Sequence, residues 1–152
     1  MVKLINSIRL SKSVIGLEEI EAVTAVLKKE FLGMGEEVRC FENELETYIG
    51  NPDYKAMCVN TGTSALHLAL ESVTNAGDEV LVPSFTYVAT YQAITAAGCI
   101  PVSCEVNKDT LLIDLNDARE RVTNKTKVIL PVLYASNPGD LEKTYALADE
   151  FN

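Results

Sequence analysis

The stretch Asn60-Thr61-Gly62-Thr63-Ser64-Ala65-Leu66-His67 lies between an apolar run, residues 56–59, and apolar residues at helical spacing up to Val73. This order predicts a strand, a short turn and the start of a helix. The first N–H groups of a helix lack partners within the helix, and the helix dipole adds positive charge there. Small hydroxylated residues let an anion approach these donors. We therefore interpret residues 61–64 as a phosphate-binding turn.

The alternative is an ordinary helix cap, in which a Thr or Ser side chain satisfies the free donors itself. Local sequence alone leaves both interpretations open. The turn matches neither a Walker loop nor the GxGxxG pattern, so those two nucleotide-binding fingerprints do not apply.

Composition narrows the function classes. The chain has 152 residues, of which 47% are hydrophobic and 23% charged, as expected for about one packed domain. A net charge of −9 argues against nucleic acid or an anionic membrane as the main partner. No apolar stretch is long enough to span a bilayer, and the N-terminus does not resemble a signal peptide.

The cysteines and the histidine indicate no metal site. There are four cysteines, with no CxxC pair, and a single histidine. A zinc site is therefore not expected. Thiols in apolar runs behave as small hydrophobes, which favours a reduced, cytoplasmic protein.

Beyond the turn, strand and helix patterns alternate. Apolar runs predict strands at residues 79–83, 100–106 and 127–133, separated by helices at 87–97 and 114–121 and followed by one at 141–151. This indicates an α/β fold with three layers, a mostly parallel sheet with helices on both faces. Ligands of such sheets bind outside the carboxyl ends of the strands. We expect residues 61–64, 84–87 and 134–137 to converge there.

The N-terminal part has a different character. Residues 1–16 lack periodicity and are expected to form an arm, whereas helices are predicted from Leu17 and over residues 36–49, the second ending at Gly50. At the other end, the alternation calls for another strand after residues 141–151, without which an apolar sheet edge stays uncovered. We therefore expect the chain to be part of something longer.

Residues 60–70 and 77–90 closely resemble the DegT/DnrJ/EryC1/StrS family of pyridoxal-phosphate (PLP)-dependent aminotransferases, which act on nucleotide-linked keto-sugars. The likeness runs from Leu10 to Leu141. It implies a partial fold-type I (aspartate aminotransferase-like) large domain. On this reading residues 1–16 are an N-terminal arm, and residues 17–152 are the first part of the PLP-binding domain.

The resemblance also implies site residues. By matching position, Thr63 and Ser64 bind the cofactor phosphate through backbone N–H groups and the Thr63 hydroxyl, and Gly62 allows close approach. Tyr87 stands where the family places an aromatic ring against the pyridine. Phe85 is expected to support the core, although Tyr87 could also be a core aromatic at a helix start.

Departures from the family pattern are equally informative. The family needs a carboxylate facing the pyridine nitrogen and a lysine that forms the Schiff base. In the family pattern both come after Asn152, so no catalytic residue is assigned here and the chain alone is expected to be inactive. Leu133 stands in place of the usual His, and Ser136 in place of a Gly.

The resemblance implies a parent enzyme that transfers an amino group from an amino acid, with glutamate expected, to a nucleotide-linked keto-sugar. Amino-sugar or polysaccharide biosynthesis and a homodimer are implied as well. Two alternatives stay open. One is a stand-alone phosphate-ligand binding or interaction module. The other is part of a PLP-dependent sugar dehydratase.

Overall fold

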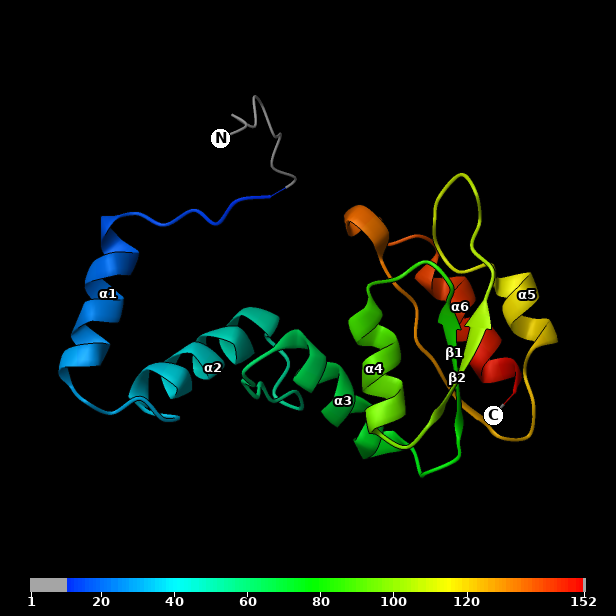
Figure 1. Cartoon of the computed structure of the whole chain (residues 1–152), viewed down its shortest axis with the longest axis horizontal. Coiled ribbons are helices and arrows are strands. Elements are labelled where there is room, and N and C mark those ends of the chain that lie inside the picture. The colour runs from blue at the N-terminus through cyan, green and yellow to red at the C-terminus, as the bar shows by residue number, and fades with distance from the viewer. Residues whose placement is uncertain (1–10, 152) are drawn as a thin grey trace, which may run out of the picture. The chain divides into compact units, whose positions relative to one another are not determined.

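A computed structural model describes residues 11–151 of the chain (Figure 1). The contacts divide the chain into two compact units, residues 1–58 and 59–152, which are described separately below. The sequence did not predict this boundary. Most of the expected arm, residues 1–10, lies outside the described residues, and residues 11–16 form neither helix nor strand.

The first unit contains two helices, α1 (Leu17–Lys28) and α2 (Glu36–Ile49), at the predicted positions. The Gly16 N–H donates to the Glu19 side chain over 2.6 Å at the start of α1. Gly50 ends α2 with a φ of 71°, a conformation that glycine adopts without strain. Neither helix contains a buried residue.

The predicted strand at residues 56–59 is absent, and this prediction was wrong. Glu42 and Glu46, one turn apart on α2, take the backbone donors of this segment instead. The Cys58 N–H donates to Glu42 Oε1 over 2.7 Å, and the Ala56 N–H donates to Glu46 Oε1 over 3.1 Å. Donors at alternate residues point to the same side of an extended chain, where a neighbouring strand would otherwise accept them. Side-chain carboxylates therefore replace the backbone hydrogen bonds that a neighbouring strand would form with this segment.

The second unit is built on a parallel sheet of three strands in the order β2-β1-β3. The strands are β1 (Glu79–Pro83), β2 (Ile100–Cys104) and β3 (Thr126–Ile129). Leu81 at the centre of β1 pairs with Val102 on one side and Ile129 on the other. The strands β2 and β3 are shorter than predicted.

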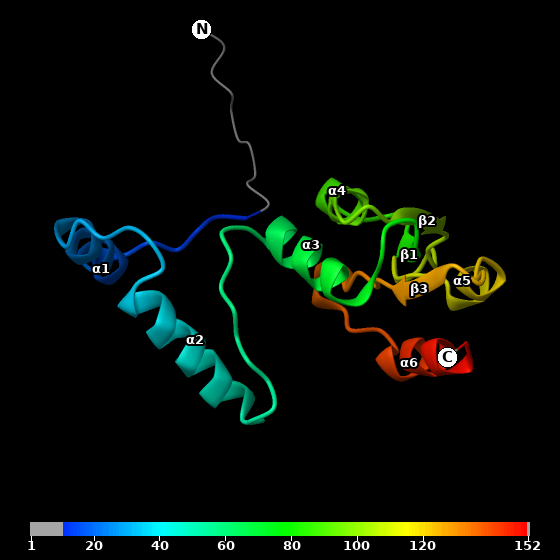
Figure 2. The ribbon, with the colours of Figure 1, turned by 90° about the horizontal axis from the view of Figure 1, so that it is seen from below.

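Helices cover both faces of this sheet, which confirms the predicted fold class. Val80 and Val82 pack against α3 (Gly62–Val73) and α4 (Val88–Ala96). Leu81, pointing the other way, packs toward α5 (Leu115–Glu120) and α6 (Leu141–Glu150). Figure 2 shows α4 and α5 on opposite sides of the strands. Over the described residues, no helix is long and apolar enough to cross a membrane.

Candidate functional site

The turn at residues 61–64 forms the first part of the candidate site, and it has a helix cap. Thr61 is the N-cap residue of α3, and its Oγ1 accepts the Ser64 N–H over 3.0 Å. The Ser64 hydroxyl donates to Asn60 Oδ1 over 2.9 Å. The Ser64 N–H is therefore satisfied by an ordinary helix cap, as the alternative interpretation of this turn predicted.

Two donors of the turn remain available. Within the described residues, the backbone N–H groups of Gly62 and Thr63 make no hydrogen bond. A Cβ built on Gly62 would meet no atom within 4 Å, and this residue does not have a positive φ. Neither packing nor backbone geometry in this chain therefore requires glycine at this position. Two free N–H groups beside open space fit an anion such as the phosphate of PLP.

Tyr87 precedes α4, and 78% of it is exposed. The neighbouring Thr86 turns inward, where its hydroxyl lies 2.8 Å from that of the buried Thr90. This contact ties the loop after β1 to the first turn of α4. Tyr87 is therefore not a core aromatic in this structure, and its ring is accessible to a ligand.

Phe85 and Tyr134 form an aromatic pair that the sequence did not predict. Their ring centroids lie 4.9 Å apart with a tilt of 53° between the planes. Phe85, expected to support the core, is 43% exposed, and Tyr134 is 42% exposed. Two of the three stretches expected to converge, residues 84–87 and 134–137, therefore meet. The third stretch, residues 61–64, forms the start of α3, and this helix packs against α4.

The loop that carries Tyr134 has an unusual backbone. Residues Tyr134–Ser136 form a short 3₁₀ turn, in which Ala135 and Ser136 have φ values of 52° and 62°. Such left-handed conformations are costly for residues with a Cβ. The sequence signal was the Ser at a position where the resembled family usually has Gly. Nothing comparable marks Ala135.

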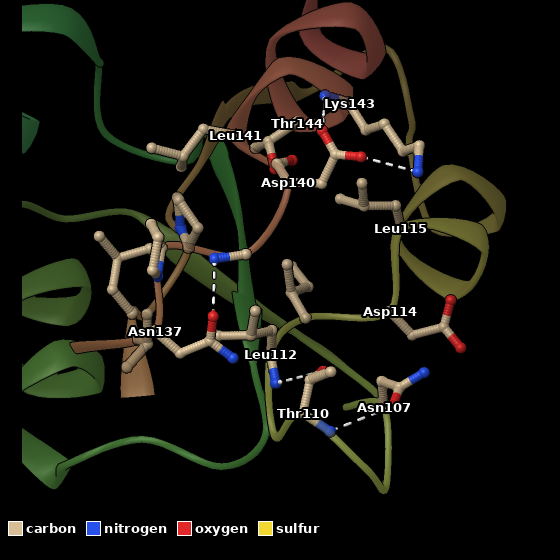
Figure 3. Close-up of a pocket in the computed structure, with 16 residues that line it drawn as sticks. Asn107, Thr110, Leu112, Asp114, Leu115, Asn137, Asp140, Leu141, Lys143 and Thr144 are labelled. Atoms are coloured by element: carbon tan, nitrogen blue, oxygen red, sulfur yellow. Dashed lines mark hydrogen bonds and ion pairs between the residues drawn. The ribbon is translucent and has the colours of Figure 1, made fainter. Parts of the chain in front are cut away.

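A separate cavity of about 450 Å³ lies between the loop after β2 and the loop after β3 (Figure 3). Asp140 caps α6 and pairs with Lys143 at 2.7 Å on its wall, and Asn137 accepts the Gly139 N–H over 3.0 Å. Sequence reasoning missed this cavity, because residues from two distant loops line it. None of Gly62, Thr63, Ser64 and Tyr87 belongs to its wall.

The four thiols are unpaired, as the sequence predicts, and two of them, Cys99 and Cys104, are buried. Burial raises the pKa of the Cys104 thiol, with a smaller contribution from the nearby Asp117 carboxylate. His67 lies on α3 with its Nε2 3.3 Å from Glu71 Oε1. These groups add no reactive centre to the site.

Known proteins are similar to this chain in sequence and in fold. The family model described as the DegT/DnrJ/EryC1/StrS aminotransferase family matches residues 13–152. A dTDP-4-dehydro-2,3,6-trideoxy-D-glucose 4-aminotransferase of Saccharopolyspora spinosa is 34% identical over 143 residues, which make up 93% of this chain and 36% of that protein.

Solved structures of related enzymes are also similar to this chain. A proposed sugar aminotransferase of Streptococcus pneumoniae, in its PLP form, is 32% identical with a TM-score of 0.87, over 95% of this chain and 37% of its own. The GDP-4-keto-6-deoxy-D-mannose-3-dehydratase of E. coli, with bound hydrated PLP, is 26% identical with a TM-score of 0.81, over 92% of this chain and 37% of its own. The chain thus spans little more than a third of the length of these relatives. With a family match over nearly all its residues, it belongs to the DegT/DnrJ/EryC1/StrS aminotransferase family.

Proposed function

We propose that this chain supplies the N-terminal part of the large domain of a PLP-dependent sugar aminotransferase. The complete enzyme would transfer an amino group from an amino acid, glutamate in our proposal, to a nucleotide-linked keto-sugar. The family membership and the S. spinosa relative support this reaction class. Assembly as a homodimer and a place in cytoplasmic amino-sugar or polysaccharide biosynthesis belong to the same proposal.

The observation that carries the proposal is the pair of unpaired N–H groups at Gly62 and Thr63, next to open space at the start of α3. In our proposal these donors and the Thr63 hydroxyl bind the cofactor phosphate. Ser64 contributes its N–H if the Thr61 hydroxyl turns aside. The ring of Tyr87, which is exposed, would lie against the pyridine ring and limit its tilt.

When bound, PLP supplies an electron sink for carbanion chemistry. The residues of this chain contribute binding and orientation. None of its lysines matches the Schiff-base position, and none of its carboxylates is assigned to the pyridine nitrogen. We therefore expect the 152-residue chain, mixed with PLP, glutamate and a nucleotide-linked keto-sugar, to show no turnover. Turnover by the pure chain would contradict this assignment.

Phosphate recognition is tested with pyridoxine 5′-phosphate, which lacks the aldehyde that reacts with surface lysines. Its fluorescence anisotropy is measured with the full chain, against pyridoxine as the analogue without phosphate. We expect at least tenfold tighter binding of the phosphate ester, equivalent to about 1.4 kcal/mol. Equal binding of the two compounds would overturn the phosphate assignment.

Gly62→Ala isolates the turn. The added methyl group meets no protein atom and requires no unusual φ, so the thermal midpoint should not fall. We expect the methyl group to hinder the close approach of the phosphate to the free donors, so affinity for pyridoxine 5′-phosphate should fall about tenfold. Ser72→Ala, at the far end of the same helix, is the control and should change neither quantity.

Two other functions make different predictions. A stand-alone binding module would have an intact mass near 16.6 kDa in its native cell. It would bind phosphate ligands by itself, without a second chain that supplies the Schiff-base lysine. The E. coli dehydratase relative favours a dehydratase as the second enzyme reading. Assaying the native form with a nucleotide-linked keto-sugar separates the two enzymes, because only an aminotransferase yields an amino-sugar.

A further inference from the structure

The aromatic pair lies where the sheet changes its direction of winding. The chain leaves β1 toward α4 on one face, and it leaves β3 toward α6 on the opposite face. The strands β1 and β3 are neighbours, so the two connections diverge from adjacent carboxyl ends of the sheet. Ligands of open parallel sheets bind at such switch points. Phe85 comes from one connection and Tyr134 from the other.

Neither ring is used by the cofactor in the function proposed above. Both are about two-fifths exposed, although each is partly covered by the other. Aromatic faces carry negative charge, which favours contact with weakly positive C–H groups. A pyranose ring has such a C–H face and is edged by hydroxyl groups. Ligand sites usually combine an apolar wall of this kind with a few polar groups.

The loop after β3 supplies the polar groups. Ser136 and Asn137 lie two and three positions after Tyr134 and are exposed. Ala135 and Ser136 also hold consecutive left-handed conformations, which are costly for residues with a Cβ. Strain of this kind is concentrated at ligand sites. These two residues directly follow Tyr134, whose ring lies against Phe85.

We propose that Phe85 and Tyr134 form a contact surface for the sugar ring of the nucleotide-linked substrate, with Tyr134 a specificity-determining residue. This inference rests on the proposed function and names a substrate contact within it. A six-membered ring could also come from the cofactor, so the experiment includes both ligands.

Saturation-transfer NMR on the full chain, with dTDP-glucose as the probe, tests the proposal. We expect stronger transfer to the pyranose C–H protons than to the thymine protons. Tyr134→Ala should reduce the pyranose transfer at least fivefold, whereas Tyr134→Phe should retain it because the ring face remains. Tyr145→Ala, which removes an exposed tyrosine of α6, is the matched control and should have no effect. Phe85→Leu keeps apolar volume without an aromatic face and should also reduce the transfer.

Pyridoxine 5′-phosphate binding is measured on the same variants. Unchanged pyranose transfer in both Tyr134→Ala and Phe85→Leu, with this binding intact, would overturn the inference and leave the proposed function standing. Loss of pyridoxine 5′-phosphate binding in Tyr134→Ala with unchanged pyranose transfer would assign the rings to the cofactor and also overturn the inference. If the unmodified chain shows no phosphate-dependent binding, the proposed function fails, and the inference fails with it.

Discussion

The Cys58 N–H donates to Glu42 Oε1 over 2.7 Å, so a helix side chain takes a donor that a strand would have used. Glu46 lies one helical turn after Glu42. It accepts a hydrogen bond from the Ala56 N–H and forms an ion pair with Lys55 at 2.9 Å. The Lys55 ammonium, followed by the Ala56 N–H, lowers the pKa of the Glu46 carboxyl. These contacts make the segment before residue 59 extended without making it part of a sheet.

Glu42→Ala should therefore loosen this segment. Removing the acceptor leaves the half-buried Cys58 N–H without its partner, at a cost of about 1 kcal/mol. Amide hydrogen exchange at Cys58 should accelerate roughly fivefold, since each 1.4 kcal/mol corresponds to a factor of ten. Glu42→Gln retains a carbonyl acceptor and should keep most of the protection. Equal loss in both variants would mean that the hydrogen bond is not the cause.

Ser136→Gly should stabilise the second unit. The left-handed conformation at φ 62° costs a Ser about 1–2 kcal/mol, and Gly adopts it freely but loses about 0.5–1 kcal/mol of backbone entropy. A net gain of about 0.5–1 kcal/mol follows and is measurable in urea unfolding. Ser84→Gly, at a position without a positive φ, should bring no gain. Destabilisation by Ser136→Gly would contradict this prediction. It would show that the Ser136 side chain stabilises the fold by more than its left-handed backbone conformation costs.

Gly139→Ala should destabilise the loop after β3 for two separable reasons. The new Cβ would lie 2.3 Å from Leu112 Cδ1, and the φ of 60° disfavours any residue with a Cβ. We expect a cost of about 2 kcal/mol in urea unfolding. In a Leu112→Ala background the steric part disappears while the conformational part remains, so the cost should fall by about half. Gly33→Ala, with an ordinary φ and its nearest atom at 3.8 Å, is the control. An unchanged cost in the Leu112→Ala background would exclude the steric contribution.

Asp117 makes stability depend on pH. Its carboxylate accepts hydrogen bonds from Arg121 and from the Glu105 N–H, which joins the end of β2 to α5. The Arg121 guanidinium, and after it the Glu105 N–H, lower the pKa of Asp117 in the folded state. The stabilisation is therefore fully present above the ordinary Asp pKa of about 3.9 and is lost as the pH falls through the lower folded value.

Urea midpoints measured between pH 2 and pH 6 test this linkage. Asp117→Asn should be less stable near pH 6 and should lose less stability below pH 4. Asp109→Asn is the control, because the Asp109 carboxylate makes no ion pair within the described residues. Parallel pH profiles for the native chain and Asp117→Asn would contradict the assignment.

Sequence reasoning succeeded where the determinants are local. The bounds Glu36–Ile49 follow from apolar spacing and from Gly50, and both act within a few residues. Parallel strands at residues 79–83 and 100–104, the second predicted two residues longer, follow from apolar runs that only a doubly covered sheet can bury. The start of α3 at Gly62 falls within the predicted turn at residues 61–64, whereas the strand expected before this turn is absent.

Tertiary structure decided what depends on partners distant in the chain. The sequence by itself determined the α/β class, the helix positions and the likeness to a PLP-dependent family. The site residues Gly62, Thr63, Ser64 and Tyr87 remain predictions. Only the fold showed that carboxylates of α2 accept hydrogen bonds from the N–H groups of residues 56 and 58. Only the fold showed that the Thr61 hydroxyl accepts the hydrogen bond from the Ser64 N–H. Only the fold brought Phe85 to Tyr134, 49 positions away in the sequence numbering. Hydrogen-bond competition and contacts between loops are set by three-dimensional proximity, which local patterns do not encode.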